Sequence, residues 1–300
     1  MIQSELHPLR LKADPSRVVV RPFHLAWQST RSDPGRSRRL VDAVLTLSDQ
    51  EIGRQFQHVM ANFEQRHWQT RKIFLRRFAE ISELLNLSVN GIGEKRKQLI
   101  GAYFCQEYSY AAAALMNPSV VPHPDQSGLD RHTVRILMSL RAVGEGHISS
   151  IAFREGLVSD RGGLELMPEP PFAVAADAPE LDQMPSDCPV TVYKSEDATL
   201  SGTVIFPVTP AQSNGLEDLR LTHFTHDDGS TEYFGTYTAF SGREIRSEML
   251  RTKDFHAAEL VPMSGDATRN KGLALFPQKI GGRYMMIGRQ DGQNMFLLEL

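Results

Sequence analysis

Cysteine is scarce in this sequence of 300 residues, which has only Cys105 and Cys188, far apart and outside any CxxC pair. Two isolated cysteines do not supply the spacing of a disulfide scaffold or a zinc site, so neither is expected. The sequence also has no run of about 18 apolar residues, so we expect no segment that spans a membrane. Residues 1–17 carry charges of both signs without an apolar stretch, unlike a secretory signal. We therefore expect a cytoplasmic protein that is not bound to membranes.

Net charge is small, at −3, but unevenly distributed along the chain. Residues 1–100 contain 17 Lys and Arg against 10 Asp and Glu, whereas the remainder contains 16 against 26. A basic half can indicate nucleic-acid binding. Here, however, the cations lie on predicted helices that also carry Glu and Gln, as the solvated face of a helix does. We expect no nucleic-acid partner.

Residues 1–115 carry mainly helical signals. A short strand is predicted in residues 17–27, ended by Pro22, and a polar loop follows in residues 28–39. Apolar side chains then recur at helical spacing through residues 40–87, with Ser48 and Glu51 placed as a capping box. A second helical run is predicted in residues 93–115. The sequence therefore predicts an N-terminal region, residues 1–115, made of a strand and a helical extension.

Residues 116–300 carry strand signals, with turn residues between short apolar segments. The turn sequences are HDDGS, SGRE and IGGR, and Gly229 suits the positive φ of the first. Many short antiparallel strands are typical of a sandwich, a barrel or a propeller, and periodicity does not choose among them. Residues 168–189, rich in Pro, Ala and Asp, are predicted to be a loop. The predicted strands lie in residues 134–143, 147–156, 203–210, 219–226, 231–240, 273–280, 283–290 and 295–300.

Four polar segments interrupt the apolar strands. The first is Asn117-Pro118-Ser119, which a simple turn would also explain. The second places Arg141, Glu145, His147 and Ser149 within nine residues, with a glycine on each side of Glu145. This segment has too few His or acidic residues for a metal site, and a polar surface hairpin is the alternative.

The third segment is Glu217-Asp218, followed by Arg220. A carboxylate with an arginine two positions later forms either an ion pair on one strand face or an acid held beside a fixed cation. Spacing alone does not decide between the two.

The fourth segment places a group of cations before one strand and at the end of the next. Arginine offers a planar fork and lysine a point charge, so the group is suited to an oxyanion such as phosphate. It lacks the GxxxxGK[ST] pattern of a Walker loop. Its residues are Arg269, Asn270, Lys271 and Arg289.

These four segments, in this order, resemble the motifs of glycoside hydrolase family 130, which contains β-mannoside phosphorylases and β-1,2-mannosidases. GLEDLRL is similar to the segment that carries the family's catalytic aspartate, RNKGLALFPQKIGGRYMMIGRQD to its N-K-x-x-A-L-F-P segment, and AALMNPS to its F-N-P segment. The resemblance extends from about Arg17 to Phe296. The predicted helical region in residues 1–115 resembles the N-terminal helical extension of a longer subgroup of this family.

The resemblance implies a mainly β fold, a five-bladed β-propeller, and a role for each matched residue. Asp218 would be the general acid, with Glu217 and Arg220 orienting it. A general acid must hold a proton near neutral pH, so Asp218 is expected to be partly buried. Arg220 is expected to point to Glu217 or to backbone rather than to pair tightly with Asp218. Sugar contacts are implied for Asn117, Arg141 and Tyr237, with Glu145 and His147 as further candidates, and phosphate contacts for Arg269, Asn270, Lys271 and Arg289.

The sequence departs from the family pattern in two places. Leu219 stands where the family often has Pro or Ala, a mild change beside the acid. Residues 116–300 are also too short for five blades of about 40 to 50 residues. We therefore expect a C-terminally truncated propeller with about three blades.

The implied activity is cleavage of β-mannosides with inversion. It would proceed by phosphorolysis to mannose 1-phosphate or by hydrolysis, with inorganic phosphate as co-substrate and no cofactor or metal. The alternative is a truncated, non-catalytic propeller that binds sugar or a protein partner. The helical region is a candidate interface for a homo-oligomer.

Overall fold

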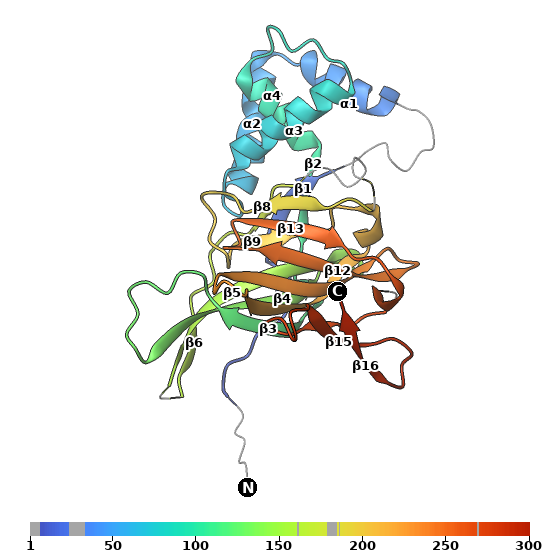
Figure 1. Cartoon of the computed structure of the whole chain (residues 1–300). Coiled ribbons are helices and arrows are strands. Elements are labelled where there is room, and N and C mark those ends of the chain that lie inside the picture. Colours follow the sequence, from blue (N-terminus) through green and yellow to red (C-terminus); the bar gives the residue numbers. More distant parts are fainter. Residues whose placement is uncertain (1–6, 24–33, 161, 179–184, 186, 269) are drawn as a thin grey trace. The chain divides into compact units, whose positions relative to one another are not determined.

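The computed structural model describes residues 7–23, 34–160, 162–178, 185, 187–268 and 270–300 (Figure 1). The chain divides into two compact units. The helical unit comprises Val18–Tyr108 and Pro171–Ala175, and the β unit comprises Met1–Arg17, Ser109–Pro170 and Ala176–Leu300. None of the described helices is long and apolar enough to cross a membrane.

Four helices and a short sheet form the helical unit. The helices are α1 (Pro34–Leu45), α2 (Asp49–Phe63), α3 (Thr70–Leu84) and α4 (Glu94–Tyr103). Strand β1 (Val18–Pro22) pairs with β2 (Cys105–Ser109), and β7 is Val174–Ala175. The predicted capping box at the start of α2 is confirmed, because the Ser48 side chain accepts from Glu51 N and the Glu51 side chain accepts from Ser48 N. The core of α1, α2, α3 and α4 includes Val41, Ile52, Phe78, Leu99 and Phe104.

Two sequence predictions for this unit were wrong at their boundaries. Helix α1 begins at Pro34, inside the loop predicted for residues 28–39, of which 28–33 lie outside the described residues. Proline is tolerated there because the first helical N–H has no intrahelical acceptor. The second helical run ends at Tyr103 rather than at residue 115, because residues 105–109 and 114–115 pair as strands. Cross-strand pairing has overridden the helical preference of the alanines.

The β unit contains one large sheet, which divides into two antiparallel parts that we call the first and second sheets, and a third, smaller sheet. The first contains β3 (Ala114–Pro122), β4 (Thr133–Val143), β5 (Ser149–Ser159), β6 (Leu164–Leu166) and β9 (Thr203–Ile205). The second contains β10 (Gly215–Thr225), β11 (Thr231–Phe240), β12 (Ile245–Thr252), β13 (Ala257–Pro262) and β8 (Val190–Tyr193). Only Gly215 and Ser149 pair between them, in parallel. The third contains β14 (Ala274–Leu275), β15 (Met285–Arg289) and β16 (Met295–Glu299).

The second sheet is packed on both faces, and its side chains alternate accordingly. On β11, Tyr233 and Tyr237 belong to a core shared with the first sheet, whereas Phe234 belongs to a core shared with the third. This period of two follows from the pleat of a strand. Leu137 and Leu216 are fully buried in the first core, and Met286 is fully buried in the second.

Each segment predicted as a strand contains one, and the protein is mainly β after its helical unit, as predicted. The HDDGS hairpin is confirmed, with Gly229 at φ +81° between β10 and β11. Strand β3 was not predicted. It passes through Asn117 and Pro118, where the sequence suggested a turn. Also missed were β6, β8, β12 and β13, and β7 lies within the predicted loop 168–189. A closed ring of five blades stays a prediction.

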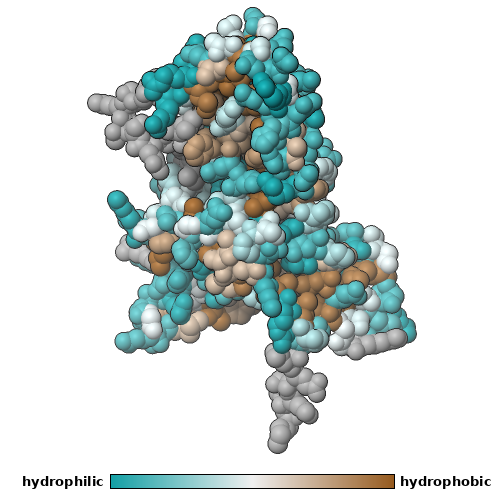
Figure 2. Space-filling model, turned by 180° about the vertical axis from the view of Figure 1, so that it is seen from behind, coloured by the Kyte–Doolittle hydropathy of each residue, from teal (hydrophilic) through white to brown (hydrophobic). Residues whose placement is uncertain are grey.

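Several large apolar side chains of the first sheet remain exposed. They include Val120 on β3, Val134 on β4 and Val158 on β5. Figure 2 shows that hydrophobic residues gather on the β unit on the face seen from behind, between hydrophilic areas.

Candidate active site

Two β-bulges face each other between the first and second sheets and carry the first polar pair. The register of β3 shifts between Met116 and Ser119, and that of β10 shifts between Glu217 and Arg220. A bulge bends a strand and redirects a side chain. Asn117 and Asp218 lie in these bulges with φ +51° and +56°, a region in which Asn and Asp are enriched among non-glycine residues. Asn117 Nδ2 donates a hydrogen bond to Asp218 Oδ1 across the gap.

Arg141, on β4, connects the two carboxylates of β10. Its Nη2 lies 2.6 Å from Glu217 Oε1, and its Nη1 lies 3.1 Å from Asp218 Oδ1. The Arg141 Nε donates to Ser149 Oγ at 2.9 Å, which fixes the third side of the guanidinium. The Glu217 side chain is 11% exposed and that of Asp218 28% exposed. A planar fork therefore holds two adjacent carboxylates at a partly buried position.

Lys271 approaches Glu217 from the segment between β13 and β14. Its Nζ lies 4.0 Å from Glu217 Oε2, and its side chain is 42% exposed. Asn270 supports this segment, because its Oδ1 accepts from Lys271 N at 2.8 Å and its carbonyl accepts from Ser247 Oγ at 2.6 Å. The exposed ammonium is thus free to contact an anion from the solvent side.

Arg220 and Arg289 meet at Gly272. Arg220 Nη1 donates to Gly272 O at 3.4 Å, so Arg220 bonds to backbone, as the sequence predicted. Gly272 has φ +88°, and a Cβ built there would lie 3.4 Å from Arg289 Nη2 and 3.7 Å from Arg220 Nη2. Glycine at this position therefore lets two guanidinium groups approach the same stretch of backbone.

The hollow next to Asp218 is small. Its volume is about 10 Å³, close to the space that one water molecule needs. Asp218, Arg220, Tyr237 and Gly272 are among its lining residues. Because Asn117 is exposed and Asp218 half-buried, any ligand larger than a water molecule would lie on the open side of the cluster rather than inside the hollow.

Tyr237, predicted to contact the sugar, is placed mainly in the core. Its side chain is in the core shared by the first two sheets, and the residue is 3% exposed. Its hydroxyl donates to Glu248 Oε2 at 2.6 Å and accepts from Gln212 Nε2 at 3.1 Å. Burial, together with the Glu248 carboxylate, raises the pKa of Tyr237 well above its ordinary value. Tyr237 therefore lines the hollow beside Asp218 from the core, with its hydroxyl already bonded to Glu248 and Gln212.

The remaining predicted residues contribute less. Glu145 and His147 are exposed on a short turn, η1 (Glu145–His147), in which His147 has φ +60°; the turn leads into Ser149. Arg269 lies outside the described residues. The structure thus brings together Asn117, Arg141, Glu217, Asp218 and Lys271, and places Arg220, Asn270 and Arg289 beside them.

Two residues that help to build the candidate active site were not among the predicted site residues. Ser149 orients Arg141, and Gly272 admits Arg220 and Arg289. Ser149 belongs to the polar segment around Glu145, but nothing in its spacing indicates a partner on the neighbouring strand. The glycine directly after Lys271 was the available signal for a close approach to backbone.

Among known proteins, several solved structures are similar to this chain. No family model matches the chain, and no curated protein matches it. One similar structure is from work on the family 130 mannoside phosphorylases, described as containing glycoside hydrolases that target β-1,2-mannosidic linkages in Candida mannan. It has 14% identity and a TM-score of 0.35, over 64% of this chain and 51% of that one. Another is the β-1,2-mannobiose phosphorylase of Listeria innocua, in complex with β-1,2-mannobiose. It has 15% identity and a TM-score of 0.30, over 61% of this chain and 56% of that one.

The solved structures similar to this chain thus include proteins of glycoside hydrolase family 130, the family that the four sequence segments resemble. The chain spans about half the length of these structures.

Proposed function

We propose that this protein is a carbohydrate-active enzyme that cleaves β-mannosides with inversion, using Asp218 as its general acid. The observation that carries the proposal is the convergence of Asn117, Arg141, Glu217, Asp218 and Lys271. These residues come from four segments, and the two joined by a hydrogen bond, Asn117 and Asp218, are 101 positions apart. A fold has no structural need for two left-handed residues in facing bulges, and such strain concentrates at functional sites.

The surroundings of Asp218 fit the carboxylate that remains after a proton has been donated, although the ion pair with Arg141 goes against the expectation that cations keep away from the acid. Asn117 and Arg141 both donate to its Oδ1, so they balance the charge that appears when the proton leaves. In the proposed reaction the proton passes from Asp218 through a hydroxyl of the mannose to the glycosidic oxygen. The bond between that oxygen and the anomeric carbon then breaks through an oxocarbenium-like transition state.

The attacking group would enter from the opposite face of the sugar. In phosphorolysis an oxygen of inorganic phosphate forms the new bond to the anomeric carbon, giving mannose 1-phosphate with inverted configuration. Lys271 supplies a partly exposed cation for this phosphate, and Arg220 and Arg289 supply two exposed cations near Gly272. In hydrolysis a water molecule would take the same place, activated by a second carboxylate. The number of cations favours phosphate.

The assay that tests the proposal measures the products formed from β-1,2-mannobiose with and without inorganic phosphate. We expect mannose 1-phosphate and mannose to form only when phosphate is present. Mannose released at the same rate without phosphate would favour the hydrolytic reaction. Binding of the disaccharide without any product would favour the non-catalytic alternative.

Lys271→Met should separate phosphate binding from sugar binding. Because the partly exposed Lys271 ammonium lies next to Glu217, the residue before Asp218, its loss should raise the KM for phosphate about tenfold and leave the KM for the disaccharide nearly unchanged. Lys279→Met, at another lysine that forms an ion pair, is the matched control. Equal effects of both substitutions on the KM for phosphate would show that Lys271 does not bind phosphate.

A further inference from the structure

A cavity of about 310 Å³ lies in the β unit, on the face of the first sheet opposite to the Asp218 cluster. Leu140 and Ala152 form part of its wall and pair directly across β4 and β5. Because successive side chains of a strand point to opposite faces, Leu140 points away from the side on which Arg141 meets Asp218. Leu115, Leu140 and Ala152 make one side of the cavity apolar.

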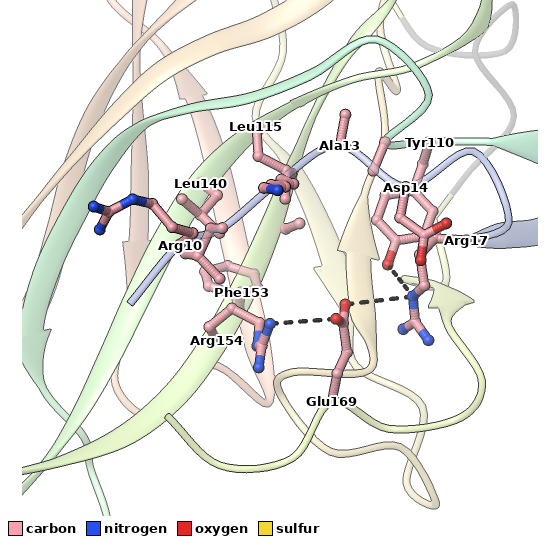
Figure 3. A pocket seen from close by; sticks show the side chains of 14 residues that line it. Arg10, Ala13, Asp14, Arg17, Tyr110, Leu115, Leu140, Phe153, Arg154 and Glu169 are labelled. Atoms are coloured by element: carbon pink, nitrogen blue, oxygen red, sulfur yellow. Dashed lines mark hydrogen bonds and ion pairs between the residues drawn. The ribbon is translucent and has the colours of Figure 1, made fainter. Parts of the chain in front are cut away.

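The opposite side of the cavity is cationic. Figure 3 shows Arg17 and Arg154 reaching the carboxylate of Glu169 from two sides. Arg17 Nε and Arg154 Nη1 each lie 3.3 Å from an oxygen of Glu169. The two arginine side chains are 12% and 13% exposed, whereas that of Glu169 is 40% exposed. Two nearly buried guanidinium groups therefore share one carboxylate, which leaves an excess of positive charge in a partly desolvated place.

The second acid in the cavity, Asp14, offsets this excess only in part, because the lining carries four cations and two acids. Asp14 uses its Oδ1 within its own turn, where it accepts from Ser16 N at 2.9 Å and from Ser16 Oγ at 2.6 Å. Arg10 and Lys12 add two more cations to the lining. Among the described residues, none accepts a hydrogen bond from the buried Nε of Arg154. The phenol of Tyr110, which accepts from Arg17 Nε at 3.2 Å, can still donate its own hydrogen.

The geometry points to a binding site for a small organic anion in this cavity, separate from the Asp218 cluster. The oxyanion of the ligand lies between Arg17, Arg154 and Tyr110, and its apolar body packs on Leu140 and Leu115. In the unliganded protein, the Glu169 carboxylate occupies the position that the oxyanion of the ligand would take. When the ligand enters, the Glu169 side chain turns toward solvent, which its 40% exposure allows. The shared chemistry is an oxyanion on a compact apolar body, carried by either a carboxylic acid or a phosphate monoester.

The test is a calorimetric titration of the full chain with benzoate, phenyl phosphate and benzyl alcohol. Benzyl alcohol has a similar apolar body without charge, so it should not bind measurably. Saturable binding of benzoate or phenyl phosphate is the expected result, and the tighter of the two identifies the class of oxyanion. Equal affinities for all three, or no binding of either anion, would overturn the proposal.

Two substitutions with opposite expected signs make the test specific. Arg154→Met should weaken anion binding about tenfold or more, because it removes a charged donor. Glu169→Gln should strengthen it, because it removes the carboxylate that competes with the ligand. Arg135→Met is the matched control: Arg135 is also on the first sheet, 18% exposed, ion-paired and with a buried Nε, but lies outside the cavity. Weaker binding in Glu169→Gln, or an equal loss in Arg135→Met, would overturn the proposal.

Discussion

At the scale of single residues, charged side chains in the β unit are held by specific partners. Glu155 is the clearest example outside the candidate site. His123 Nε2 lies 3.5 Å from its Oε1, and Ser201 N and Ser201 Oγ donate to its Oε2 at 3.0 and 2.9 Å. The hydrogen bond from His123, together with those from Ser201, lowers the pKa of Glu155 from 4.5 to about 2.

This shift has a consequence for stability against pH. Because the folded state releases the Glu155 proton more readily than the unfolded state, the stability it contributes is complete above about pH 4.5. That stability is lost as the pH falls toward about 2. We expect the free energy of unfolding, measured with urea, to fall over this range, and to fall less steeply in Glu155→Gln. Glu165→Gln, at an exposed position of β6, should leave the slope unchanged. An unaltered slope in Glu155→Gln would contradict this interpretation.

The two cysteines should differ in reactivity. Burial raises the pKa of the Cys105 thiol to about 12, whereas Cys188 is exposed. Only the thiolate attacks an alkylating agent, so Cys105 should be nearly inert at pH 8. Mass spectrometry after iodoacetamide treatment of the native protein should find carbamidomethyl on Cys188 alone. Equal labelling of both without denaturant would show that β2 opens readily around Cys105.

At the scale of elements, the helical unit depends on one close approach between helices. A Cβ on Gly101, in α4, would lie 1.9 Å from Phe74 O, in α3. Backbone cannot yield as a flexible side chain does, so α3 and α4 can pack this closely only with glycine at position 101. Gly53, in α2, has no atom within 4 Å of its Cβ position.

Alanine at these two glycines should therefore act in opposite directions. Gly101→Ala should lower the free energy of unfolding by about 2 kcal/mol or more, because α3 and α4 must separate. Gly53→Ala should raise it by about 0.5–1 kcal/mol, because alanine is the better helix former. Urea unfolding followed by helical circular dichroism measures both. Destabilisation of similar size in both variants would contradict the close packing.

Element types were easier to predict than element boundaries. The capping box of Ser48 and Glu51 is a local signal, so the start of α2 could be predicted from a few residues. The end of α4 could not be, because β2 and β3 exist through partners distant in sequence. The same applies to the bulges at Asn117 and Asp218, since a register shift is a relation between two strands.

At the scale of the whole molecule, the candidate site depends on three sheets being stacked in chain order. The first supplies Asn117 and Arg141, the second supplies Glu217 and Asp218, and the segment leading to the third supplies Lys271. Sequence motifs identified these residues through a family resemblance, and the structure brings them within bonding distance of one another. Their roles in binding and catalysis stay predictions.

Two features of the candidate site could not be predicted from the sequence. The orientation of Arg141 by Ser149 needs the strands β4 and β5 in register. The burial of Tyr237 depends on which face of β11 meets the first sheet. Both are properties of the assembled sheets, and periodicity fixes neither the partner strand nor the face that is covered.

The measurement that tests the central claim most directly compares binding and turnover of β-1,2-mannobiose in Asp218→Asn. The amide keeps the shape of the side chain but cannot donate the acid proton, so kcat should fall by at least about 10² while the Kd for the disaccharide changes little. Asp228→Asn, in the exposed HDDGS turn, should leave both unchanged. Full turnover in Asp218→Asn would contradict the assignment of Asp218 as the acid.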